Sequence, residues 1–198
     1  MIFDLPTIIQ TVGYAGIAAI VFAESGLFFG FFLPGDSLLF TAGFLASQGF
    51  FNIWLLIALT TPAAILGDSV GYWFGKKTGP LIFTREDSFW FSQKRVREAK
   101  EFFEKYGAKS IVLARFIPFV RTFTPIVAGV GGMNYRTFLT YNIVGAFLWA
   151  TLIPLLGYYL GSAIPGIDRY IIPVILLIVV ISAIPIVRKF LRNRKTLK

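Results

Sequence analysis

The sequence predicts an all-α integral membrane protein. It is expected to contain two inverted repeats, each a re-entrant helical hairpin followed by a transmembrane helix, and a final C-terminal transmembrane helix. Three observations lead to this prediction: the composition, apolar stretches of spanning length, and an internal repeat. Of the 198 residues, 56% are hydrophobic and 15% are charged, whereas a soluble domain averages about 25% charged residues. The polar side chains are too few to cover a water-facing surface, so most of the chain is expected to lie in a bilayer.

The absence of two residue types removes many enzyme classes. The chain contains no cysteine and no histidine, which excludes disulfide scaffolds, thiol nucleophiles, zinc or haem sites with His or Cys ligands, and Ser-His-Asp triads. A membrane aspartyl protease needs two aspartates on adjacent spans. Asp36 follows Pro34-Gly35 in an expected hairpin, so it makes a weak match with Asp68. We therefore expect no enzymatic activity, no metal and no cofactor.

The net charge of +9 is concentrated in two blocks of sequence. Residues 76–109 hold nine Lys and Arg against five Asp and Glu, and residues 188–198 hold six Lys and Arg with no acid. Lys and Arg resist translocation, so both blocks, and with them the C-terminus, are predicted to lie in the cytoplasm. Nucleic-acid binding needs a solvated basic face with stacking aromatics. The tail fits contact with anionic membrane lipids better, and no nucleic-acid partner is expected.

Apolar stretches give the order of the elements. A spanning helix needs about 20 apolar residues. In chain order, the predicted elements are a broken apolar segment at about 12–50, a span at 53–75, the charged segment at 76–109, a second broken segment at 110–135, and spans at 138–161 and 170–187. No Lys or Arg precedes Lys76, so the basic region of a cleavable signal is missing and the N-terminus is expected to belong to the mature protein.

Helices are predicted to break in two of these segments. The first contains Glu24 and then Pro34-Gly35-Asp36, and the second contains Arg115, Pro118 and Arg121. Broken backbone at membrane depth persists only where protein or a water-filled cavity satisfies its hydrogen-bonding groups. Both segments are therefore expected to lie inside the protein.

An internal repeat accompanies the two broken segments. Gly71-Tyr72-Trp73-Phe74-Gly75 recurs as Gly157-Tyr158-Tyr159-Leu160-Gly161, and Ala42-Gly43 recurs at the same spacing as Ala128-Gly129. A small-residue packing motif can arise twice by chance, but two landmarks at one spacing favour duplication. The predicted organisation is a single membrane domain over residues 1–198, with repeat one at about 12–80, repeat two at about 104–166, and a C-terminal span at about 168–188.

The two cytoplasmic blocks orient the repeats. Both basic blocks are predicted to lie in the cytoplasm, and the two spans at 138–161 and 170–187 between them already bring the chain back to that side. A further crossing by residues 110–135 would leave the blocks on opposite sides. Residues 110–135 must therefore enter and leave on the cytoplasmic side, as a re-entrant hairpin. By analogy, residues 17–50 form a re-entrant hairpin followed by one span, and one net crossing per repeat turns the second repeat upside down. The alternative is that residues 17–32 cross the membrane outright. Inverted repeats with broken helices meeting near the midplane are typical of secondary transporters.

Five charged residues inside the apolar segments form the candidate site: Glu24, Asp36, Asp68, Arg115 and Arg121. Each costs roughly 2.5–3.5 kcal/mol at the centre of a spanning helix, so they are expected to face one another or water. The acids lie in the first repeat and the arginines in the second. One hypothesis is a set of structural salt bridges. The other is that the arginines bind an anionic group such as phosphate while a partly desolvated carboxylate exchanges protons.

Three motifs that contain these residues resemble the signature blocks of the bacterial DedA family. They are Glu24-Ser25-Gly26 with Leu33-Pro34-Gly35-Asp36, then Gly67-Asp68-Ser69-Val70-Gly71-Tyr72-Trp73-Phe74-Gly75-Lys76, and finally Ala114-Arg115-Phe116-Ile117-Pro118-Phe119-Val120-Arg121-Thr122. The resemblance covers about residues 10–165 and rests on the order and spacing of the motifs. It implies an inner-membrane protein with paired re-entrant hairpins, related to the VTT-domain lipid scramblases of eukaryotes.

The resemblance also implies roles for particular residues. The acidic pair that is important in the family corresponds to Glu24 and Asp36, and its arginine pair corresponds to Arg115 and Arg121. The remaining motif positions are expected to serve packing: Pro34, Gly35, Gly71, Tyr72, Gly75 and Pro118. Members of the family are linked to maintenance of the membrane potential, envelope integrity and recycling of undecaprenyl phosphate.

We therefore expect a multi-pass transporter of the bacterial inner membrane. Its expected substrate is undecaprenyl phosphate, another phosphate-bearing polyprenyl lipid or a related anionic lipid, with proton coupling through Glu24 and Asp36. One alternative is a proton or cation antiporter that handles no lipid, and another is an envelope assembly factor that transports nothing. Lipid carriage predicts a laterally open groove lined by Phe and Leu, whereas ion exchange predicts a closed aqueous path between acids. The sequence predicts no oligomeric state.

Overall fold

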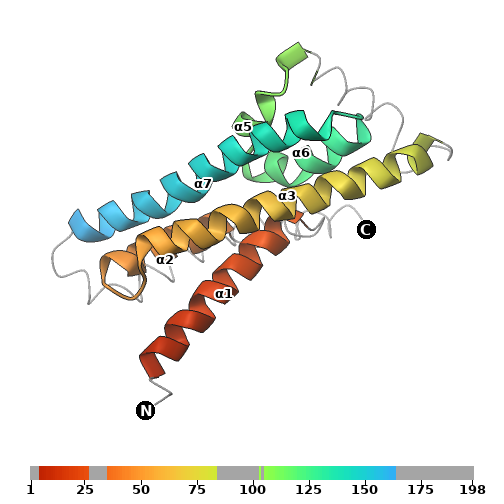
Figure 1. Ribbon diagram of the computed structural model, residues 1–198. Coiled ribbons are helices and arrows are strands. Elements are labelled where there is room, and N and C mark those ends of the chain that lie inside the picture. Colours follow the sequence, from red (N-terminus) through yellow and green to blue (C-terminus); the bar gives the residue numbers. More distant parts are fainter. Residues whose placement is uncertain (1–4, 27–34, 84–102, 104, 164–198) are drawn as a thin grey trace, which may run out of the picture.

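The computed structural model describes residues 5–26, 35–83, 103 and 105–163, and this part of the chain is all-helical, as predicted. Its helices in chain order are α1 (Leu5–Gly26), α2 (Gly35–Ser47), α3 (Ile53–Phe83), α5 (Ser110–Ala114), α6 (Pro118–Val130) and α7 (Tyr135–Ala163) (Figure 1). The predicted C-terminal span at 170–187 lies outside the described residues.

Helices α3 and α7 are long and apolar enough to cross a membrane. The qualifying stretches are Ile53–Gly79, with 27 residues and a mean hydropathy of 1.6, and Tyr135–Ala163, with 29 residues and a mean hydropathy of 1.8. At a rise of about 1.5 Å per residue, each exceeds the ~30 Å hydrocarbon core. Two of the three predicted spans are thus confirmed as long apolar helices, and Figure 1 shows them side by side and antiparallel.

The boundaries of both spans differ from the prediction. Helix α3 continues through Lys76 and Lys77 to Phe83, so the start of the predicted charged segment is helical. The Lys76 ammonium group lies 5.0 Å from the centre of the Trp73 ring, which is how a long cationic side chain remains compatible with an apolar helix end. Helix α7 begins at Tyr135, three residues before the predicted start at 138.

The two long helices begin in the same way. The side-chain oxygen of Asn52 accepts hydrogen bonds from the backbone N–H groups of Trp54 and Leu55, at 2.9 and 3.1 Å. The side-chain oxygen of Asn134 accepts one from the N–H of Arg136 at 2.9 Å. Asparagine is among the preferred N-caps because it satisfies N–H groups that have no partner within the helix.

The helices before these caps also end alike. Gly49 after α2 and Gly132 after α6 have φ angles of 82° and 72°, a left-handed conformation that glycine adopts without steric cost. The N–H of the residue after each glycine donates to the carbonyl five residues earlier, at 3.1 and 3.0 Å. This is the Schellman form of helix end, so the α2–α3 and α6–α7 connections have the same local structure.

The predicted break in the second apolar segment is confirmed. Helix α5 ends at Ala114 and α6 begins at Pro118. Between them Ile117 is extended, with φ −111° and ψ 106°, because the proline ring disfavours helical backbone in the residue before it. In the first segment the helix ends at Gly26 and a new one begins at Gly35, and the connection between them lies outside the described residues.

The other helices pack against α3 and α7. Helices α1 and α6 contact α3, with α1 meeting α3 at an angle (Figure 1), and α2 contacts α7. Glycine allows α3 to approach α6 closely, because a Cβ atom at Gly75 would overlap the backbone oxygen of Ile126. It does the same for α7 and α2, because a Cβ atom at Gly157 would overlap the backbone oxygen of Phe40. The outward faces of α3 and α7 carry half-exposed large apolar side chains such as Trp54, Leu66 and Phe147, as expected for lipid contact.

Candidate functional site

The five charged residues predicted from the sequence lie close together in the structure. Glu24 lies in the last turn of α1 and Asp36 in the first turn of α2. Arg115 directly follows α5, Arg121 lies in the first turn of α6, and Asp68 lies within α3. Four of the five therefore stand where a helix ends or begins. All five together form two ion-pair clusters.

The first cluster is centred on Arg121. One terminal nitrogen of its guanidinium group donates to Glu24 Oε1, and the other donates to Asp36 Oδ1 at 2.6 Å. The side chains of Arg121 and Glu24 are 11% and 4% exposed, whereas that of Asp36 is 38% exposed. Arg121, from the second broken segment, thus binds the acid at the end of α1 and the acid at the start of α2.

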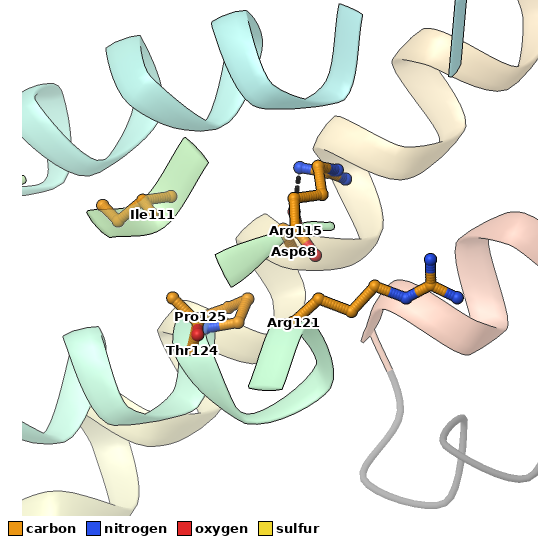
Figure 2. A pocket seen from close by; sticks show the side chains of 6 residues that line it. All are labelled: Asp68, Ile111, Arg115, Arg121, Thr124 and Pro125. Atoms are coloured by element: carbon orange, nitrogen blue, oxygen red, sulfur yellow. Dashed lines mark ion pairs between the residues drawn. The ribbon is translucent and has the colours of Figure 1, made fainter. Parts of the chain in front are cut away.

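The second cluster is centred on Arg115. Its NH1 group lies 2.6 Å from Asp68 Oδ2 and donates to Asn142 Oδ1 at 2.7 Å. The amide of Asn142 in turn donates to the backbone oxygen of Ile65 at 3.2 Å. The side chains of Arg115 and Asp68 are both almost fully buried. Figure 2 shows this ion pair, with Arg121 extending away from it toward α1.

Trp149 on α7 joins the two clusters. Its indole N–H donates to Asp36 Oδ1 at 2.7 Å, and its ring centre lies 4.8 Å from the Arg121 guanidinium carbon and 5.7 Å from that of Arg115. Neither Trp149 nor Asn142 is predicted from the sequence as a site residue. A signal for Asn142 was available, because an amide in an otherwise apolar span usually has a partner inside the protein; Trp149 carries no such signal.

Gly35 leaves room for the carboxylate of Glu24. A Cβ atom at Gly35 would overlap Glu24 Oε2, so this carboxylate lies directly against the backbone that starts α2. The start of a helix carries a partial positive charge, which favours a carboxylate there. Glu24 Oε2 is nevertheless buried with no hydrogen-bond partner among the described residues. Pro34, the preceding motif residue, lies outside the described residues.

Tyr72, Gly71 and Gly75 of the other motif positions lie where α3 meets α6, the α6–α7 connection and α7. Tyr72 is fully buried, its hydroxyl donates to the backbone oxygen of Met133, and its ring stacks on Phe138 with the ring centres 4.7 Å apart. A Cβ atom at Gly71 would lie 3.3 Å from Pro125 Cβ. Pro118 is the first residue of α6, and its side chain is outside the described part.

Replacing Gly75 by alanine should therefore destabilise the protein. The added methyl group would overlap backbone of α6, and overpacking of this kind costs about 1–3 kcal/mol. The matched control is Gly16→Ala in α1, where a Cβ atom meets nothing within 4 Å and alanine is the better helix former. Thermal unfolding in detergent should show a lower midpoint for Gly75→Ala and no loss for Gly16→Ala. Equal midpoints would mean that α6 does not approach α3 closely at this position.

The space between the two clusters is small. A cavity of about 10 Å³ is lined by Asp68, Ile111, Arg115, Arg121, Thr124 and Pro125 (Figure 2). This volume suits about one water molecule and is too small for a phosphate group. Within the described residues, no group of three or more His, Cys, Asp or Glu side chains is placed to hold a metal ion.

The formal charges in the two clusters do not balance. Three carboxylates, those of Glu24, Asp36 and Asp68, face two guanidinium groups. Unbalanced charge in a buried site is costly, so binding of one proton or one other cation would neutralise the site. The arrangement is therefore chemically suited to bind a cation, and its guanidinium groups are suited to bind an anion if a carboxylate leaves them.

Comparison with known proteins places these residues in a family. Residues 33–159 match the VTT domain. A membrane protein of Mycobacterium leprae is 45% identical over 166 residues, which are 84% of this chain and 74% of the relative. Protein DedA of Escherichia coli is 42% identical over 184 residues, 92% of this chain and 84% of the relative. The inner membrane protein YghB of Escherichia coli is 36% identical over 165 residues, 82% and 74% of the two chains. No solved structure matches the chain.

Proposed function

This chain belongs to the DedA family of VTT-domain membrane proteins, and from that premise we propose that it moves a phosphate-bearing polyprenyl lipid, such as undecaprenyl phosphate, or a related anionic lipid across the inner membrane. The proposed role is transport coupled to protons, without catalysis. The observation that carries the proposal is the sharing of Arg121 between Glu24 and Asp36, with a second arginine, Arg115, beside it.

The arginines make the proposed site an anion site that can bind a phosphate group. A guanidinium group offers donors in a fixed planar fork that matches the oxygens of carboxylates and phosphates alike. In the present arrangement carboxylates occupy these donors and the adjacent cavity is too small for phosphate. We therefore take this arrangement as the lipid-free state, in which acids of the protein stand where the lipid phosphate binds.

Charge balance supports the coupling to protons. A phosphate monoester carries about −1.5 to −2 charges near neutral pH, enough to neutralise Arg115 and Arg121 by itself. Carboxylates that lose their arginine partners in a buried site bind protons, because burial disfavours the charged form. A phosphate that takes both arginines leaves three carboxylates without a cationic partner. Protons are proposed to bind as the lipid enters, and to leave as it is released, on the buried Asp68 and on the pair Glu24 and Asp36. Asp36 is the more exposed acid of this pair, so it is the proposed point of proton entry.

The packing of α1 and α5 supports the proposed inverted topology. The Asn52 N–H donates to the Tyr14 hydroxyl at 2.5 Å, so α1 passes the α2–α3 connection, where the open end of the first hairpin would lie. Ile111 of α5 belongs to the same buried cluster as Tyr72 and Ala128, near the other end of α3, where the second hairpin would open. The charged residues at the two hairpin tips then meet between these ends.

Single cysteines in this cysteine-free chain test the topology. Asn134→Cys and Lys94→Cys should react with an impermeant thiol reagent only from the cytoplasm, and Phe50→Cys, at the exposed α2–α3 turn, only from the outside. The C-terminus is likewise proposed to be cytoplasmic, so Lys198→Cys should behave like Lys94→Cys. Labelling of position 134 from outside, with position 94 protected, would make the second broken segment a full crossing and would contradict the inverted repeat.

A second candidate function is proton or cation exchange without lipid. The observation that favours it is the cavity between the clusters, which has room for about one water molecule and is lined by Asp68 and both arginines. The two functions differ in their requirement for a phosphate lipid. Proteoliposomes should transfer polyprenyl monophosphate and not the uncharged polyprenol if the proposed function is correct; equal transfer of both lipids would contradict it.

A further inference from the structure

Trp149 is the buried residue that touches both ion-pair clusters. It is 2% exposed, donates its N–H to Asp36 Oδ1, and places its ring near both guanidinium groups. Asp36 Oδ1 is also the oxygen that Arg121 binds. Trp149 belongs to the long helix α7, whereas the charged residues it contacts lie at the ends of short helices.

The two kinds of contact made by Trp149 have different consequences. The N–H group fixes the carboxylate of Asp36 while that carboxylate is ionised and paired. The ring attracts a guanidinium group through its π face, an interaction that uses none of the N–H donors in the guanidinium plane. An arginine held in this way keeps its position when a carboxylate leaves it, and its in-plane donors become available to other oxygens.

We propose that Trp149 is a positioning residue that holds Arg115 and Arg121 as one anion site when a lipid phosphate replaces the carboxylates. The inference rests on the proposed function, which supplies the anion. Trp149 does not itself contact the phosphate in this account. It acts through the two guanidinium groups, by keeping them in place during the exchange of partners.

Tryptophan fluorescence tests this inference without transport. The chain has four tryptophans, so combining Trp54→Phe, Trp73→Phe and Trp90→Phe leaves Trp149 as the single tryptophan, which is excited selectively at wavelengths that tyrosine does not absorb. Adding polyprenyl monophosphate in detergent should give a saturable change in emission, and uncharged polyprenol should give none. Arg121→Lys in the same background should weaken the apparent affinity about tenfold. Saturation by inorganic phosphate alone would support the anion site and identify free phosphate as its ligand.

Two substitutions of Trp149 separate its ring from its N–H group. Trp149→Phe keeps an aromatic face near the arginines, so the lipid concentration that gives half-maximal flux should stay within about threefold of wild type. Trp149→Leu removes the face, and this concentration should rise about tenfold. Trp54→Leu, which changes an exposed tryptophan of α3, is the matched control and should leave flux unchanged. A merely structural tryptophan would lower the amount of folded protein in both variants without changing the half-saturating concentration.

The outcomes separate this inference from the proposed function. Emission that responds to phosphate lipid in a protein that transfers none would refute the proposed function and leave the positioning role standing. Normal transfer of phosphate lipid, with no emission response and with an unchanged half-saturating concentration in Trp149→Leu, would overturn the positioning role and leave the proposed function standing.

Discussion

Replacing Arg121 by lysine is expected to lower the flux of polyprenyl monophosphate by about 10- to 100-fold while the protein remains folded and inserted. Lysine keeps the positive charge but cannot donate from one planar group to two oxygens. A hydrogen bond to a charged group contributes about 1.5–3 kcal/mol, and each ~1.4 kcal/mol corresponds to a factor of ten. The measurement is lipid flux in proteoliposomes, normalised to the amount of reconstituted protein.

The control for this experiment is Arg136→Lys, because Arg136 is an exposed arginine at the start of α7. A second variant, Arg121→Ala, leaves Glu24 without its cationic partner in a buried site. Breaking a buried pair in this way costs about 3–5 kcal/mol, so this variant should unfold at a lower temperature. Equal flux for wild type and Arg121→Lys would mean that Arg121 serves only as a structural link from α6 to α1 and α2.

Neutralising Glu24 or Asp36 is expected to abolish the dependence of lipid flux on a pH gradient. Glu24→Gln and Asp36→Asn preserve side-chain shape but remove a proton-binding carboxylate. The two clusters together have three carboxylates and two guanidinium groups. One amide replacement therefore leaves their charges balanced, and the protein should stay folded. Flux should become the same with and without an imposed gradient, while binding of the lipid is retained.

Glu101→Gln is the control for the acidic residues, because it removes one carboxylate from the charged stretch 76–109 and should leave the gradient dependence intact. Asp68→Asn gives a further comparison, since Asp68 pairs with Arg115 rather than Arg121. If the gradient dependence survives in both Glu24→Gln and Asp36→Asn, these two acids have only a structural role and another group carries the coupled proton.

The sequence predicted the members of the site because charged residues in apolar segments are costly and must find partners. It did not predict which carboxylate each arginine binds. Arg115 binds Asp68 and Asn142 because α5 packs on α7 beside α3, and that packing depends on contacts far apart in sequence. Trp149 was missed for a related reason, since a tryptophan in an apolar span is usually a lipid or core contact.

The fold was predictable to a similar depth. Hydropathy located α3 and α7, and Pro118 together with Arg115 and Arg121 in an apolar segment located the second break. The pairing of α2 with α7 and of α6 with α3 was not predictable, because a glycine-rich face shows that a helix packs closely without showing which helix it meets. The end of the helix predicted at 53–75 was placed too early, because lysines at the end of an apolar helix do not end it.

The most direct test of the central claim measures lipid and proton movement together in one preparation. Wild-type protein is reconstituted in liposomes that contain polyprenyl monophosphate, with the membrane potential clamped and a pH gradient imposed. The account predicts that lipid flux increases with the gradient and that protons move only when the phosphate lipid is present. Lipid flux that is the same with and without the gradient would make the protein a passive scramblase, and proton flux without the lipid would make it an ion exchanger; either result would contradict coupled transport.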